Sequence, residues 1–88
     1  MTSITGQFFT GESSKTHDAT LMFDGAKSLK VIYRDGETSD KVESLNISSR
    51  LGNIPRYLKF SNGGKFVTAD NVAVDNLLKQ AGLNPKND

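Results

Sequence analysis

Residues 20–36 read Thr-Leu-Met-Phe-Asp-Gly-Ala-Lys-Ser-Leu-Lys-Val-Ile-Tyr-Arg-Asp-Gly and contain two Asp-Gly pairs on either side of an alternating stretch. Asp-Gly favours the tight turns of β-hairpins, because these residues accept the positive φ that such turns need. In residues 28–34, three apolar side chains fall on one face of an extended chain, and an isoleucine with two basic residues falls on the other. This stretch predicts a half-buried strand at 28–34 that pairs with a strand at 20–23.

The flanking sequence continues the same pattern of short strands and turns. Another turn is predicted at Asn62-Gly-Gly64, and the polar stretch 38–40 is expected to be a loop. The opening strand includes Gly6, which we interpret as a bulge. A proline near the start of a strand favours an edge position or the first residues of that strand, as at Pro55. The further predicted strands are 4–10, 42–49, 54–60 and 65–68.

After residue 68 the apolar period changes from two to that of a helix. One stripe at i, i+3, i+4 and i+7 is formed by Val74, Leu77, Leu78 and Ala81. Asp70 or Asn71 can cap the start of this helix. Residues 82–85 read Gly-Leu-Asn-Pro, where the glycine suits a left-handed C′ position, the leucine closes the usual hydrophobic contact and the proline prevents continuation. The sequence therefore predicts a helix at about 71–81.

Together these segments predict a mainly β (α+β) fold, a small antiparallel curled sheet or partly open barrel with one C-terminal helix. The 88 residues suffice for one core. We expect a single domain over 1–83, a frayed tail or linker at 84–88, and a monomer.

Composition excludes several classes of site. The chain has no cysteine, so neither disulfides nor thiolate metal ligands can form. Its net charge of +1 gives no long-range attraction for nucleic acid. No secretory signal pattern and no run of about 18 apolar residues is found, so this segment is expected not to span a membrane.

Candidate catalytic residues are few. His17 is the only histidine, and a hydrolytic triad would require it to meet Ser13 or Ser14 together with an acid. One imidazole does not make a typical zinc centre. We therefore expect no catalytic residue, no cofactor and no metal ligand in this segment.

Two stretches could contact a partner. Residues 48–57 place two arginines, a Gly-Asn turn and a proline between two strands, so Arg50, Asn53 and Arg56 are the predicted partner contacts. Arginines at such positions can bind a carboxylate or other acidic group. Alternatively, basic and aromatic strand residues could stack single-stranded nucleic acid, although the balanced charge makes this partner the less favoured one.

A family resemblance also emerges from residues 6–11 (Gly-Gln-Phe-Phe-Thr-Gly), 13–14 (Ser-Ser), His17, 49–56 (Ser-Arg-Leu-Gly-Asn-Ile-Pro-Arg) and 64–68 (Gly-Lys-Phe-Val-Thr). Nearly the whole chain resembles the N-terminal domain that precedes membrane-bound CAAX-protease/HtpX-like zinc metallopeptidases of Gram-negative bacteria. In that family, membrane helices and a peptidase domain with a zinc-binding H-E-x-x-H helix follow. No catalytic residue of the family transfers to any position of this sequence.

The resemblance implies a non-catalytic accessory or binding domain that contacts the peptidase body or a substrate polypeptide. Zinc is then expected only in a following peptidase domain, and the location is the cytoplasmic face of the inner membrane, or otherwise the cytoplasm. A pleckstrin-homology-like barrel closed by a helix would suit this picture. The alternative is an autonomous small β-domain that binds nucleic acid or an anionic ligand.

Overall fold

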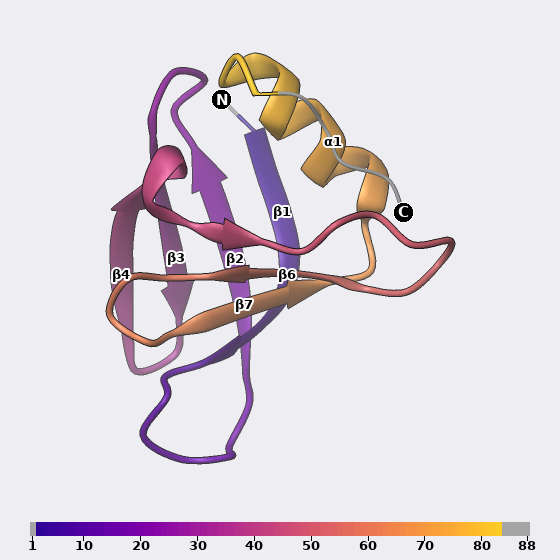
Figure 1. Ribbon diagram of the computed structural model, residues 1–88. Coiled ribbons are helices and arrows are strands. Elements are labelled where there is room, and N and C mark those ends of the chain that lie inside the picture. Colours follow the sequence, from indigo (N-terminus) through magenta and orange to yellow (C-terminus); the bar gives the residue numbers. More distant parts are fainter. Residues whose placement is uncertain (1, 84–88) are drawn as a thin grey trace.

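The computed structural model describes residues 2–83, which form one seven-stranded antiparallel sheet closed by a helix (Figure 1). The strand order is β4-β3-β2-β1-β7-β6-β5. The fold is the predicted mainly β one, a curled half-barrel with a C-terminal helix. Its elements are β1 (Thr2–Phe9), β2 (His17–Phe23), β3 (Ser28–Tyr33), β4 (Gly36–Lys41), the 3-10 helix η1 (Val42–Ser44), β5 (Asn46–Ile47), β6 (Arg56–Lys59), β7 (Lys65–Thr68) and α1 (Asn71–Gln80).

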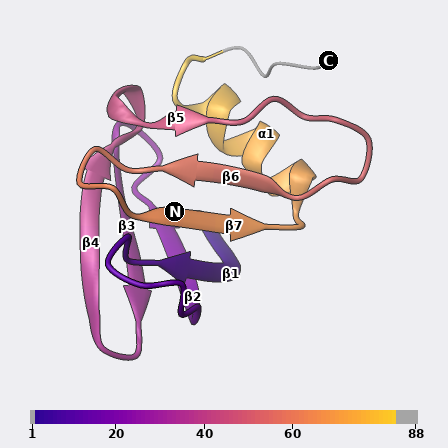
Figure 2. The same cartoon turned by 60° about the horizontal axis from the view of Figure 1, so that its bottom comes forward.

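The central strand β1 produces the curl of the sheet. It pairs with β2 from Thr2 to Phe8 and with β7 only at its far end, where Gln7 lies opposite Val67. As a result, β5, β6 and β7 cross the direction of β1 to β4 (Figures 1 and 2). The curl brings both groups of strands around one core.

Gly6 permits this close crossing, but it is not the bulge that the sequence predicted. The β1–β2 register runs without interruption through Gly6, which lies opposite Ala19. A Cβ at Gly6 would collide with the carbonyl oxygen of Val67 and lie 2.8 Å from Phe66 Cζ. Glycine is needed here because β7 approaches β1 too closely for any side chain.

The core lies between the concave face of the sheet and α1. The predicted apolar stripe of the helix is buried at Val74, Leu77 and Leu78. Phe8 stacks on Tyr33 and meets Phe60 edge-on, with ring centroids 5.0 and 6.0 Å apart. The helix therefore closes one open end of the half-barrel, as Figure 2 shows.

The polar stretch 38–40 is part of strand β4 and not a loop, which corrects the prediction. β4 pairs with β3 from Gly36 to Lys41. Its inward side chains meet polar groups of the β6–β7 turn: the backbone and hydroxyl of Ser61 donate to Asp40 at 3.1 and 2.8 Å. The amide of Asn62 donates to Thr38 Oγ1 at 2.9 Å. The polar composition of β4 thus reflects its contact with the β6–β7 turn, a seam that these polar side chains bridge.

The predicted strand 42–49 is also corrected, since only Asn46–Ile47 extends as β5. Residues Val42–Ser44 form the 3-10 helix η1, in which Val42 is buried and its N–H donates to the carbonyl of Lys27 at 2.8 Å. This bond holds Val42 beside the 25–27 turn, and the chain turns through η1 there instead of continuing as a strand. The alternation that the sequence suggested there is interrupted for this reason.

Both ends of α1 follow the sequence signals. Asp70 caps the start, accepting the N–H of Ala73 at 3.0 Å. At the other end Gly82 has φ +79°, and the Leu83 N–H donates to the Leu78 carbonyl at 2.8 Å, as in a Schellman motif. The helix ends at Gln80, one residue before the prediction. The predicted tail at 84–88 lies outside the described residues.

Among the helices of residues 2–83, none combines the length and the hydropathy that a membrane span requires.

Candidate binding cleft and its arginine cluster

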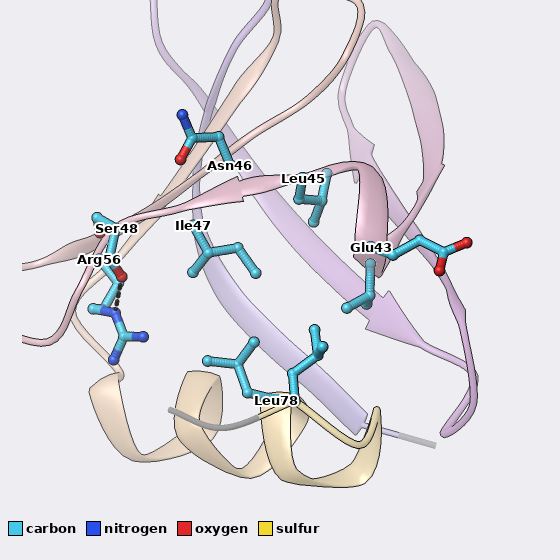
Figure 3. Close-up of a pocket in the computed structure, with 9 residues that line it drawn as sticks. Glu43, Leu45, Asn46, Ile47, Ser48, Arg56 and Leu78 are labelled. Atoms are coloured by element: carbon cyan, nitrogen blue, oxygen red, sulfur yellow. Dashed lines mark hydrogen bonds between the residues drawn. The ribbon is translucent and has the colours of Figure 1, made fainter. Parts of the chain in front are cut away.

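Arg56 opens strand β6 on the inward face of the sheet, two residues before the buried Leu58. Only 1% of Arg56 is exposed, although a buried arginine is tolerated only when its charge and donors are paired. Its Nε donates to the Ser48 carbonyl at 2.8 Å, as Figure 3 shows. Arg56 therefore ties β6 to the segment that follows β5.

Asp75 on α1 completes the cluster. Its two carboxylate oxygens accept from different arginines, Oδ1 from Arg56 Nη1 at 2.8 Å and Oδ2 from Arg50 Nη1 at 2.7 Å. Burial alone would raise the pKa of Asp75, but the hydrogen bonds and positive charges of Arg56 and Arg50 outweigh burial and hold that pKa below its ordinary value. This Arg50–Asp75–Arg56 cluster joins the 48–57 segment to the helix.

The three predicted contact residues fall in different environments. Arg56 is buried, with 1% of the residue exposed, and pairs with Asp75 and Ser48 within the chain; its predicted role as a partner contact stays a prediction. Arg50 keeps 36% of its side chain exposed, and Asn53 lies on the exposed Gly52–Asn53 turn. The structure thus brings Arg50 and Arg56 together on Asp75 and leaves Asn53 apart. Contact through Arg50 and Asn53 stays a prediction.

Next to this cluster lies a cleft of about 420 Å³ between β5 and the C-terminal half of α1. Leu45 and Ile47 point from the β5 side towards Leu78 on the helix (Figure 3). Arg56 and Ser48 stand at one end, and Glu43 extends away at the other (Figure 3). The lining residues are Val42, Glu43, Leu45, Asn46, Ile47, Ser48, Arg56, Leu78 and Leu83. The cleft is apolar along its length and polar where Arg56 lies.

Strand β5 borders this cleft and is the last strand of the sheet. In the part of the chain that the structure describes, β5 pairs with β6 alone. An edge strand presents backbone N–H and C=O groups to which an extended chain can add. The cleft therefore combines apolar walls with a main-chain edge.

His17, the other candidate, lies at the start of β2. Its Nδ1 is 3.8 Å from Asp35 Oδ2, and its ring packs 5.2 Å from that of Tyr33. The Ser13 hydroxyl accepts from the Lys15 N–H, and within residues 2–83 no hydrogen bond joins His17 to Ser13 or to Ser14. No group of three or more possible metal ligands occurs over the same residues.

Of the basic and aromatic strand residues that could stack nucleic acid, Phe9, Tyr57 and Lys65 lie on the outer face of the sheet. The Lys65 ammonium lies 5.1 Å from the centroid of the Phe9 ring and 5.9 Å from that of Tyr57. These cation–π contacts occupy the rings that a base would stack on. Phe8 and Phe66 are buried in the core.

Sequence reasoning missed Asp75 and the cleft. Asp75 follows Val74 on the border of the apolar helical stripe, where a half-buried carboxylate requires a cation. The signal for that cation was the position of Arg56, which alternates in phase with Leu58 and Phe60. An arginine in phase with the apolar residues of a strand, together with an acid at the border of an apolar helical stripe, would have identified the buried Arg56–Asp75 pair.

Fold and cleft together define a small β half-barrel closed by a helix, with an arginine cluster at one end of an apolar cleft. Residues 3–81 match the family described as "Domain of unknown function (DUF7092)", and the chain belongs to that family. No curated protein matches the chain. No solved structure matches it either, so the pleckstrin-homology analogy stays a prediction.

Proposed function

We propose that this domain is a non-catalytic module that binds polypeptide in its cleft and serves a membrane-bound zinc metallopeptidase. Its partner is the peptidase body or a substrate chain, on the cytoplasmic face of the inner membrane. Zinc belongs to the peptidase domain in this proposal and not to this segment. The sequence resemblance supports the peptidase context, and the cleft between β5 and α1 supports the binding role.

The single observation that carries the binding role is the combination of Leu45, Ile47 and Leu78 with an edge strand. Addition of an extended peptide to a sheet edge gains main-chain hydrogen bonds, and a neighbouring apolar groove selects side chains. Here the groove lies between the edge strand and the helix. This arrangement suits an extended segment with apolar residues better than a folded surface.

Binding is tested by titrating the isotope-labelled 88-residue chain with β-casein, an unstructured polypeptide, and following amide signals by NMR. We expect changes concentrated in residues 42–48 and 77–83. Ile47→Ser should weaken binding by at least about threefold, because it removes apolar surface from the cleft. The matched control is Ile32→Ser, which changes an exposed isoleucine, 45% accessible, on the outer face of β3.

Absence of binding, or changes centred on the outer face, would contradict the binding role. Both variants are first compared with the parent chain by circular dichroism, so that only folded protein enters the titration.

The peptidase context has a separate test in the coding sequence of the gene. Apolar helices and an H-E-x-x-H segment in the same reading frame, or in a neighbouring gene whose product co-purifies with this chain, would support it. If neither the reading frame nor a neighbouring gene encodes a peptidase, the peptidase context is refuted, but the polypeptide-binding role is not.

A further inference from the structure

The arginine cluster carries an unbalanced charge. Two guanidinium groups, on Arg50 and Arg56, share the single carboxylate of Asp75, so the cluster has a net charge of +1. Glu43 lines the opposite end of the cleft and its carboxylate points away from Arg56 (Figure 3), so it does not pair with the cluster. Arg56 brings this cluster to the apolar walls of the cleft, whereas Arg50 lies outside the lining with 36% of its side chain exposed. An excess positive charge beside apolar walls favours binding of an anion.

Arg56 also has donors to spare. Its Nε donates to Ser48 and its Nη1 to Asp75. Among residues 2–83, the only side-chain nitrogen or oxygen atom that is both sealed from solvent and without a partner is Asn71 Oδ1. Arg56 Nη2 is not such an atom, and within residues 2–83 it donates no hydrogen bond, so it is the donor that Arg56 can offer to a ligand in the cleft. Its guanidinium stands at the Ser48 end of the cleft, on the same side of β5 as Ile47 (Figure 3).

The net charge of +1 on the cluster is balanced by a ligand with the single negative charge of one carboxylate. A phosphate dianion would exceed the imbalance of one, whereas a carboxylate equals it and suits guanidinium geometry. A chain-terminal carboxylate is part of the main chain, so it can follow directly from a segment laid along the edge of β5. If the carboxylate belonged to a side chain, the main chain of the ligand would be displaced from the edge of β5.

We infer that the cleft binds the C-terminus of a polypeptide, with the terminal carboxylate at Arg56 and the last apolar side chains between Ile47 and Leu78. This inference rests on the proposed polypeptide-binding function and specifies its ligand. It requires an apolar final residue and a free carboxylate.

Three synthetic peptides test the inference by NMR titration of the labelled chain. The first is acetyl-Ala-Val-Leu-Val-Leu with a free carboxylate, the second is its C-terminal amide, and the third is an amide with one internal glutamate. We expect the free acid to bind at least about tenfold more tightly than either amide, the difference expected for one charge-assisted hydrogen-bonded contact.

Arg50→Gln tests the charge argument with the buried Arg56–Asp75 pair intact. It makes the cluster neutral, so the preference for the free acid should fall by about threefold or more. Arg34→Gln is the matched control, because it removes one exposed positive charge away from the cleft and should keep the preference.

Equal binding of acid and amide would overturn the inference, and so would a preference unchanged by Arg50→Gln. Tight binding of the internal-glutamate amide would assign the site to side-chain carboxylates and refute the terminal one. Failure of all three peptides also refutes the inference. The β-casein titration then decides separately whether the polypeptide-binding role survives.

Discussion

Replacing Asp75 by asparagine should destabilise the domain more than any other single exchange of an acid for its amide. The substitution keeps the size of the side chain but removes the charge that balances Arg56, of which 1% is exposed. Breaking a buried ion pair by removing one partner costs about 3–5 kcal/mol. The Asp75 side chain is 14% exposed, and Arg56 retains its bond to Ser48. We therefore expect a loss of about 2–3 kcal/mol, which corresponds to a fall in Tm of about 10–20 °C in a domain of this size.

Urea unfolding followed by circular dichroism measures this loss at neutral pH. Asp70→Asn is the matched control on the same helix, because asparagine caps a helix about as well as aspartate. We expect that control to stay within about 0.5 kcal/mol of the parent. An Asp75→Asn variant as stable as the control would refute the reasoning, since it would mean that the Arg50–Asp75–Arg56 cluster contributes nothing.

The dependence on pH provides a second arm of the same experiment. The pKa of Asp75 in the folded protein lies below its ordinary value of 3.8, so the ionised carboxylate stabilises the fold. That contribution is present above pH 3.8 and is lost as the pH falls through the lower, folded-state pKa. The gap in stability between the parent and Asp75→Asn should therefore narrow in acid. A gap that is constant or widens there would contradict the assignment.

Two other substitutions probe the sheet. Gly6→Ala should lower the free energy of unfolding by about 1–3 kcal/mol, because its methyl group would strike the β7 backbone and Phe66. The control in thermal unfolding is Gly36→Ala, whose Cβ would meet nothing closer than 3.4 Å. Equal losses of stability in the two variants would contradict the steric reason. Asp40→Ala should speed amide exchange in the β6–β7 turn by removing the acceptor that closes the seam, measured by hydrogen–deuterium exchange; unchanged exchange there would show that the seam does not depend on this carboxylate.

Much of the architecture could be predicted because its turns and helix ends are local. Gly25 and Gly63 have φ of +88° and +94°, as the first Asp-Gly signal and the Asn-Gly-Gly signal require, and Gly82 ends α1 in the same way. The second Asp-Gly pair is corrected: Gly36 has no positive φ and starts β4 opposite Tyr33, so residues 34–35 make the turn. Strand β4 could not be predicted by the same reasoning. Its inward residues are polar because they face Ser61 and Asn62 across the seam, and that long-range contact leaves no apolar alternation to detect.

The site was predictable only in part, since its key contact joins residues distant in sequence. Arg50 and Arg56 stood out by type, but their roles differ because strand phase buries Arg56, whereas Arg50 lies between β5 and β6 with 36% of its side chain exposed. Asp75, 19 residues beyond Arg56, joins them only after the helix packs on the sheet. The cleft is equally non-local, because its two walls come from β5 and α1.

The central place of β1 has a consequence for synthesis on the ribosome. Gln7 and Val67, which lie opposite each other, are separated by 60 residues of chain. At a synthesis rate of about 5–20 residues per second, the edge of β1 that pairs with β7 lacks its partner strand for roughly 3–12 s. A hairpin of β1 and β2 can form early, but the half-barrel cannot be completed until β7 emerges. The strand made first is therefore among the last to be fully paired, and its unpaired edge is where a nascent chain would be most prone to mispairing.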